Sequence, residues 1–263
     1  MATRDPRKAI NQISVAIDTS LQGLAALETA ATLAARLQAS LEALFVEDIN
    51  LFHLAELPFA RELISTSGEE RTVDATQMTQ ALQEHAHRVR RALTAATRDL
   101  EIASSLKIVR GQYMDIALGV THADVVFMCG ARGRPLTTSR RRVQRLAPQR
   151  PVYVLYDASP AAKRALALAD EAARYLETHL IVLLPVIKGK RPATLQRQAE
   201  RSLNGQTVAR YVTVPSGDAD SLNQELHATG CALVVVPREH STLASRGHSG
   251  LLDTIDCPLV LVA

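Results

Sequence analysis

Short apolar runs alternate with longer amphipathic segments along the whole chain. In the segments 23–39, 74–100 and 193–203, apolar residues recur at the spacing of one helix face. The short runs are continuous and rich in Val, Ile and Leu, which is typical of strands buried on both faces of a parallel sheet. The alternation predicts a doubly wound, flavodoxin-like α/β fold with right-handed crossovers. The nine predicted strands are 13–17, 41–46, 106–109, 125–129, 152–156, 180–186, 208–214, 233–236 and 259–262.

An internal repeat divides the sequence. Shifting the chain by 139 positions superposes residues 15–44 on residues 154–183 without a gap and with ten identities. An Asp-x-Ser pair, beginning at Asp18 and again at Asp157, keeps its place after a strand in both copies. A second register, offset by 107, aligns the later strands. The repeat predicts a duplicated unit, with a deletion in the middle of the second copy.

The strand count is one short of two complete five-stranded units. Run 152–156 ends at Asp157, so it corresponds to the first strand of the second unit. We therefore expect one domain over residues 1–149 and a shorter one over residues 150–263. The first unit then has an open sheet edge after strand 125–129. An unpaired edge exposes backbone groups that can pair with another chain and cause aggregation. We expect the second unit or a second chain to cover that edge.

Composition and charge narrow the class of protein. Of the 263 residues, 47% are hydrophobic and 22% charged, which excludes disordered and low-complexity chains. Aromatic residues make up only 3%, which disfavours stacking platforms for single-stranded nucleic acid. The net charge of +3 arises from segment 132–150, which has seven arginines and no acid. A basic patch this short favours binding of an anion or of an acidic partner over binding of DNA.

No apolar run has the length of a signal peptide or a membrane span, so a cytoplasmic protein without membrane association is expected. Cys129, Cys231 and Cys257 are odd in number and lack metal-ligand spacing, so neither a disulfide nor zinc is expected. Cys129 and Cys231 are predicted to be small buried hydrophobes. His85 and His87 are two apart on a helix and point away from each other. Catalytic motifs are missing, which predicts no catalytic centre.

Candidate binding residues gather at the carboxyl ends of the central strands, where doubly wound sheets bind ligands. Each first strand ends in Asp-x-Ser, and the fourth strand runs into Gly130 and Gly133, spaced as Gly-x-x-Gly. These motifs and the long amphipathic helix resemble the universal stress protein family, and the tandem arrangement resembles its two-domain members. The resemblance implies two adenine nucleotide alpha hydrolase-like units packed as an intramolecular pseudo-dimer. One branch of that family binds ATP, and for this branch the resemblance implies that glycine backbone N–H groups hold the phosphates and that the Asp after the first strand contacts the nucleoside.

That branch is marked by Gly-x-x-Gly, nine further residues, and then Gly followed by Ser or Thr. The first half keeps Gly130 and Gly133 but lacks the later pair. The second half keeps only Gly250. In segment 239–257 acids outnumber arginines three to one, which predicts repulsion of phosphate.

Two hypotheses follow from this partial motif. The first is a degenerate member that acts as a stress-associated interaction or scaffold protein, with an unknown protein partner or as a homodimer. The second is an ATP sensor with one site in the first half and at most slow ATPase or autophosphorylation activity. The aspartates equally fit helix capping, and the glycines equally fit a tight turn. A retained site would use Asp18, Val46, Gly130, Arg132, Gly133, Thr138 and Ser139, with Asp157 and Gly250 as second-half equivalents.

Overall fold

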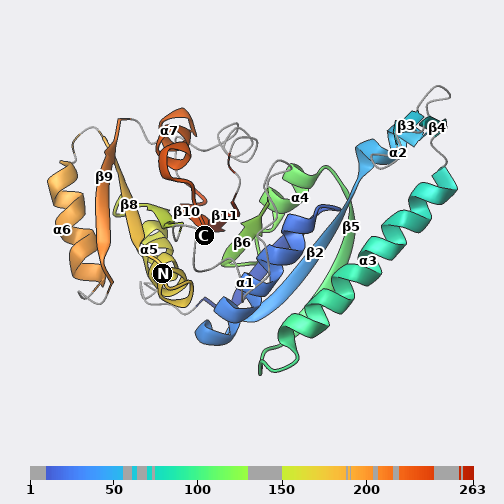
Figure 1. Cartoon of the computed structure of the whole chain (residues 1–263). Helices are drawn as coiled ribbons and strands as arrows, with labels where there is room; N and C mark the ends of the chain where they lie inside the picture. Colours follow the sequence, from blue (N-terminus) through green and yellow to red (C-terminus); the bar gives the residue numbers. More distant parts are fainter. Residues whose placement is uncertain are drawn as a thin grey trace.

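A nine-stranded sheet runs through the protein in the computed structural model (Figure 1). The structure describes residues 10–55, 61–63, 70–72, 75–129, 150–187, 189, 191–203, 207–215, 219–239, 255 and 257–263. The strand order is β5-β2-β1-β6-β11-β10-β7-β8-β9. The strands are β1 (Gln12–Ile17), β2 (Ser40–Asp48), β5 (Ser104–Gly111), β6 (Val125–Met128), β7 (Val152–Leu155), β8 (Leu180–Pro185), β9 (Ala209–Val214), β10 (Leu233–Pro237) and β11 (Leu259–Val262).

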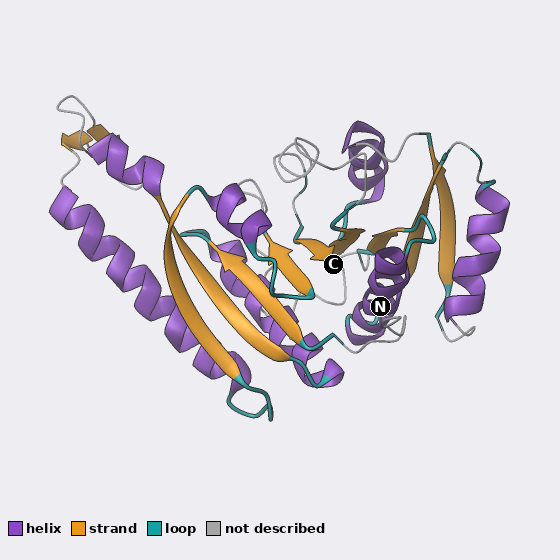
Figure 2. Ribbon diagram, turned by 180° about the vertical axis from the view of Figure 1, so that it is seen from behind, coloured by secondary structure: helices purple, strands orange, loops and turns teal. Residues whose placement is uncertain are grey.

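Helices cover both faces of this sheet (Figure 2). The larger core cluster lies under α1 (Leu21–Leu37), α3 (Ala75–Thr97), α5 (Pro160–Tyr175) and α6 (Pro192–Leu203). The second cluster lies under α4 (Tyr113–Gly119) and α7 (Ala219–Thr229) on the opposite face. Side chains alternate between the two clusters along each central strand, as a sheet buried on both faces requires.

The predicted doubly wound α/β fold is confirmed. Every strand pair within either half of the sheet is parallel, and the nine predicted strands are the nine strands of the sheet. The sequence analysis missed α2 (Ile49–Ala55) and the antiparallel pair β3 (Arg61–Leu63) and β4 (Glu70–Thr72). It also missed α4 and α7. A helix of seven residues makes only about two turns, which is too few to show a clear helical period.

The two halves of the sheet repeat one strand order. The order β5-β2-β1-β6 in the first half corresponds to β9-β8-β7-β10 in the second, and over the described ranges only the second half adds a fifth strand to the sheet, β11. β11 pairs with β10 in parallel and with β6 antiparallel, from Leu259 opposite Met128 to Val262 opposite Val125. The edge expected to be open after the fourth strand is therefore covered by the last strand of the second half.

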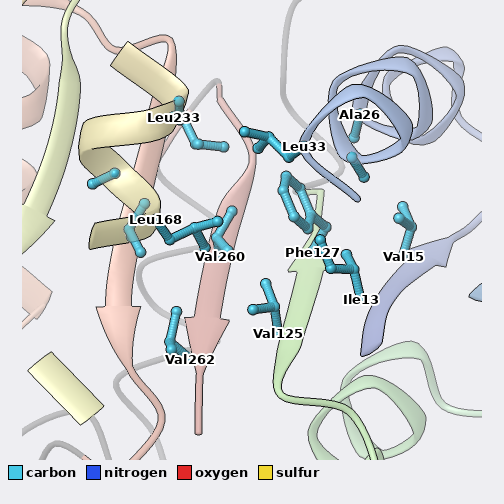
Figure 3. Packing of buried hydrophobic residues seen from close by; sticks show 14 of the residues in the cluster. Ile13, Val15, Ala26, Leu33, Val125, Phe127, Leu168, Leu233, Val260 and Val262 are labelled. Atoms are coloured by element: carbon cyan, nitrogen blue, oxygen red, sulfur yellow. The ribbon is translucent and has the colours of Figure 1, made fainter. Parts of the chain in front are cut away.

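The seam between β6 and β11 is buried as completely as the rest of the core. Phe127 and Val260 are opposite each other in the ladder, and both are fully buried. Figure 3 shows Phe127 close to Leu33 of α1, with Leu168 of α5 on the β11 side of the same layer. Residues from both halves thus fill one continuous core.

Contacts between α1 and α5 cross the seam in a reciprocal pattern. Arg36 donates to Glu171 at 2.8 Å, and Thr32 donates to the Tyr175 hydroxyl at 3.3 Å. In the register of 139, position 32 corresponds to 171 and position 36 to 175, so each position contacts the equivalent of the other. This is the contact pattern of a two-fold axis relating two copies of one unit.

The expectation that no disulfide forms is wrong. Cys231 and Cys257 are bonded to each other, with Cα atoms 6.0 Å apart. Each residue lies two positions before a strand, β10 or β11, and those strands are parallel neighbours, so their entry points meet. Spacing along the chain could not show this, because the two cysteines are 26 positions apart and an entire crossover lies between them. Cys129 is outside this disulfide and is buried, as predicted.

None of the helices in the described segments is long and apolar enough to cross a membrane.

Candidate functional site

The candidate site lies at the carboxyl ends of β1 and β6. These strands are paired from Ile13 opposite Val125 to Val15 opposite Phe127, and the direction of winding reverses between them. Ligands of doubly wound sheets bind at this kind of switch point. Asp18 follows β1, and Cys129 follows β6. The predicted site residues Gly130, Arg132, Gly133, Thr138, Ser139 and Gly250 lie outside the described residues.

Asp18 and Asp157 make the same local turn in the two halves. The Asp18 carboxylate accepts a hydrogen bond from the backbone N–H of Ser20 at 2.9 Å and another from the Ser20 hydroxyl. The Asp157 carboxylate accepts from the N–H of Ser159 at 2.8 Å, and the Ser159 hydroxyl then caps α5 through the N–H of Ala162. Each carboxylate thus stabilises the turn that starts a helix, as Asp does in Asx turns.

Val46 belongs to the core of the first half. It lies in β2 opposite Val109 of β5, and its side chain is 1% exposed within the second core cluster. Its side chain is therefore not available to a ligand, and a nucleotide could use only its backbone.

Tyr113, the first residue of α4, fills the space between the ends of β1 and β6. Its hydroxyl donates to the carbonyl of Ala16 at 3.0 Å and accepts from the N–H of Cys129 at 2.9 Å. One phenol thus bridges the two strands beyond the last paired residues, Val15 and Phe127. A hydrogen-bonded side chain therefore lies between the two strand ends at the switch point.

The titratable groups around this bridge are held neutral. Burial raises the pKa of the Tyr113 hydroxyl well above its ordinary value, and the neighbouring Cys129 adds to that effect. Burial, assisted by the Asp18 carboxylate, raises the pKa of the Cys129 thiol to about 12. A thiol with that pKa is a poor nucleophile at neutral pH. The arrangement offers hydrogen bonds and packing rather than acid, base or nucleophilic chemistry.

His85 of α3 also faces this end of the sheet. Desolvation and the nearby Arg88 lower the pKa of its imidazole, while Glu84 and Asp18 act in the opposite direction. Over the described ranges, no group of three or more His, Cys, Asp or Glu side chains is placed to hold a metal ion.

A second polar cluster closes the neighbouring strand ends. Arg110 of β5 donates to Glu47 of β2 from Nε at 3.2 Å and from Nη2 at 3.1 Å. The same guanidinium lies 3.8 Å from the ring centre of Phe52 in α2. This cation–π contact fixes α2 over the carboxyl ends of β2 and β5.

A cavity of about 560 Å³ lies at the opposite edge of the sheet. Asn11, Gln38 and Glu101 are among the residues that line it, and they lie where the first-half strands begin. The switch point is at the other edge, so this cavity does not belong to the candidate site.

Tyr113 was missed by the sequence analysis, which considered only the ends of the first and fourth strands. A signal was present, because Tyr113 lies only four positions after the end of the predicted strand 106–109, at the carboxyl edge. A tyrosine that ends up there has to bury its ring and find a partner for its hydroxyl.

Replacing Tyr113 with phenylalanine tests the bridge. The ring stays, but the Ala16 carbonyl and the Cys129 amide lose their partner, so we expect a loss of about 1–3 kcal/mol in the free energy of unfolding by urea denaturation. Tyr211→Phe in β9 is the matched control, since the Tyr211 hydroxyl makes no hydrogen bond to the described residues. Equal losses in the two variants would show that the bridge contributes nothing.

Fold and site together define a doubly wound α/β protein in which a tyrosine bridges the strand ends at the switch point of the first half. No family model and no curated protein matches the sequence. Among solved structures, a universal stress protein from Archaeoglobus fulgidus is similar over 96% of both chains, with 15% identity and a TM-score of 0.54. The chain therefore has the universal stress protein fold.

Two further structures are less similar. A protein from Pseudomonas aeruginosa described as functionally unknown matches 97% of this chain and 92% of its own, with 13% identity and a TM-score of 0.44. A universal stress protein solved in complex with cAMP matches 44% of this chain and 98% of its own, with 20% identity and a TM-score of 0.38.

Proposed function

We propose that this chain is a tandem universal stress protein that works in the cytoplasm as a binding or scaffold protein and does not hold ATP stably. The observation that carries the proposal is the Tyr113 bridge. A nucleotide at the switch point needs space between the ends of β1 and β6, and the phenol that joins Ala16 to Cys129 occupies it. Fold alone does not assign function, so the proposal rests on this site.

The state of the Asp18 carboxylate supports the same conclusion. Among the described residues, Ser20 donates both of the hydrogen bonds that this carboxylate accepts, which makes Asp18 part of the turn before α1. The incomplete glycine motif of the first half adds to this. Three features of a nucleotide site are thus altered together: the space, the carboxylate and the phosphate loop.

The tandem arrangement, with domains 1–149 and 150–263, is supported by the repeated strand order and by the reciprocal contacts of α1 and α5. In this proposal the two domains form a pseudo-dimer inside one chain. A protein partner would meet the arginine-rich segment 132–150, which favours an acidic surface. The end strands of the sheet, β5 and β9, are the edges to which a second copy of the chain would add.

The alternative is an ATP sensor with one site in the first half. Gly130 and Gly133 favour it, because glycines let backbone N–H groups approach phosphate. Asp18 also favours it, since its carboxylate stays near the switch point, where it raises the pKa of Cys129. Under this alternative Tyr113 must swing out when the nucleotide enters.

Thermal unfolding with and without Mg-ATP separates the two. A ligand at 100 times its Kd adds about 2.7 kcal/mol of stability, which for a chain of this size raises Tm by roughly 5–11 °C. We expect a change below about 1 °C at millimolar ATP, and no adenine nucleotide in the purified protein. A clear rise in Tm, or co-purified nucleotide, would establish the sensor instead.

A further inference from the structure

Arg238 crosses the seam from the second half to the first. It directly follows β10, at the carboxyl edge of the second-half strands, and its backbone N–H donates to Val262 of β11 at 2.8 Å. Its Nη1 donates to the carbonyl of Val120 at 2.7 Å. Val120 is the C-cap residue that follows α4, so the cation lies at the negative end of that helix.

The other two nitrogens of this guanidinium have no hydrogen-bond partner among the described residues. Within the part of the chain that the structure describes, Nε and Nη2 of Arg238 are buried and make no hydrogen bond. Burial lowers the pKa of the group, and the Glu239 carboxylate only partly opposes that effect. A single carbonyl bond does not compensate a desolvated cation with five N–H donors. Buried donors left unpaired in a native protein call for an explanation.

The identity of the two unpaired nitrogens indicates what is missing. Nε and Nη2 lie on one edge of the guanidinium plane, and their N–H groups point the same way. That edge is the fork which grips the two oxygens of a carboxylate or phosphate side by side. Nη1, which is bonded to Val120, lies at the other end of the group. The tether across the seam therefore leaves the anion-binding edge unused.

We propose that Arg238 is the receptor of a second-half site for a single oxyanion group, phosphate or carboxylate, gripped by Nε and Nη2. This site goes beyond the proposed function, because it does not use the switch point that Tyr113 bridges. It does not need glycine backbone either, so the loss of Gly-x-x-Gly in the second half does not remove it.

Segment 239–257 is predicted to repel phosphate, but Arg238 reduces that repulsion at the proposed site. That segment begins one residue after Arg238, and including Arg238 reduces its net charge from −2 to −1. A compact oxyanion fits this charge better than a triphosphate, whose additional charges would face Glu239.

Thermal unfolding with inorganic phosphate, at constant ionic strength set by NaCl, tests the site. At ten times its Kd, phosphate should raise the Tm of the full chain by about 3–6 °C. Arg238→Gln should abolish the rise, and Arg238→Lys, which keeps the charge but loses the fork, should weaken binding by about tenfold. Arg197→Gln on the exposed face of α6 removes the same charge elsewhere and should keep the full rise.

Sodium acetate as a second probe distinguishes the sources of the anion. A rise with phosphate alone assigns a phosphorylated ligand, and a rise with both assigns a carboxylate as well. If Arg238→Gln does not fold, Arg238→Lys and phosphorus NMR line broadening with the native chain replace it. The proposal is overturned if phosphate stabilises the native chain no more than NaCl does, or if the Arg238 variants respond as the native chain does.

Discussion

Replacing Phe127 with alanine should lower the free energy of unfolding by about 3–5 kcal/mol, the range measured for buried aromatic residues cut to alanine. Phe127 is fully buried and lies between Val15 of β1 and Val260 of β11 in the sheet. For a chain of this length such a loss corresponds to a Tm lower by roughly 6–20 °C. The cavity would open on the strand that links the two halves.

The position of Phe127 also predicts how the variant unfolds. Among the described strands, β6 is the only one of the first half that pairs with the second half, so both halves should lose stability in a single transition. Hydrogen exchange measured in β2 and in β8 follows the two halves separately. Val208→Ala, at a side chain 86% exposed, is the control and should change stability by less than about 0.5 kcal/mol. Faster exchange in β2 alone would show that the halves unfold independently.

The strands were predictable because each is a short, continuous apolar run. A strand that is buried on both faces is apolar at nearly every position, so its run is not interrupted by polar residues. The strand count also predicted the seam. Nine runs with Asp157 after the fifth left one edge of strand 125–129 without a partner, and β11 covers it. What the count could not give was the direction of that pairing. Antiparallel pairing at this seam depends on how the halves pack, which no local pattern records.

The candidate site was less predictable, because its decisive contacts are long-range. Asp18 was placed correctly at the end of β1, but its hydrogen bonds to Ser20 fit the capping interpretation as well as a ligand role. Tyr113 is 97 residues from Ala16, and only the folded sheet brings its hydroxyl to that carbonyl. Arg238 likewise reaches Val120 across 118 residues. In both cases the local sequence shows only a polar residue after a strand.

The disulfide between Cys231 and Cys257 constrains the strand that forms the seam. Cys231 and Cys257 are 1% and 5% exposed, and they tie the start of β11 to the start of β10. β11 in turn is the strand on which β6 pairs. A constraint on β11 therefore stabilises both halves, although the two cysteines belong to the second.

Removal of this disulfide should cause the second large loss of stability. For cysteines 26 positions apart, the chain-entropy model gives a loss of about 3.5 kcal/mol. The double variant Cys231→Ala, Cys257→Ala should therefore melt roughly 7–14 °C below the native chain. A reductant should lower the Tm of the native chain by a similar amount and leave the double variant unchanged. Cys129→Ala, which removes the free thiol, should keep the response to reductant.

This disulfide would be unusual in the cytoplasm, where the protein is predicted to work, because the cytoplasm of most cells keeps thiols reduced. Alkylation during lysis, followed by unfolding and mass spectrometry, counts the thiols in the cell. One free thiol, Cys129, means that the buried disulfide survives there, since reductants reach it only when β11 detaches. Three free thiols mean that the protein works without the bond. The seam would then be weaker by the loss seen in the double variant.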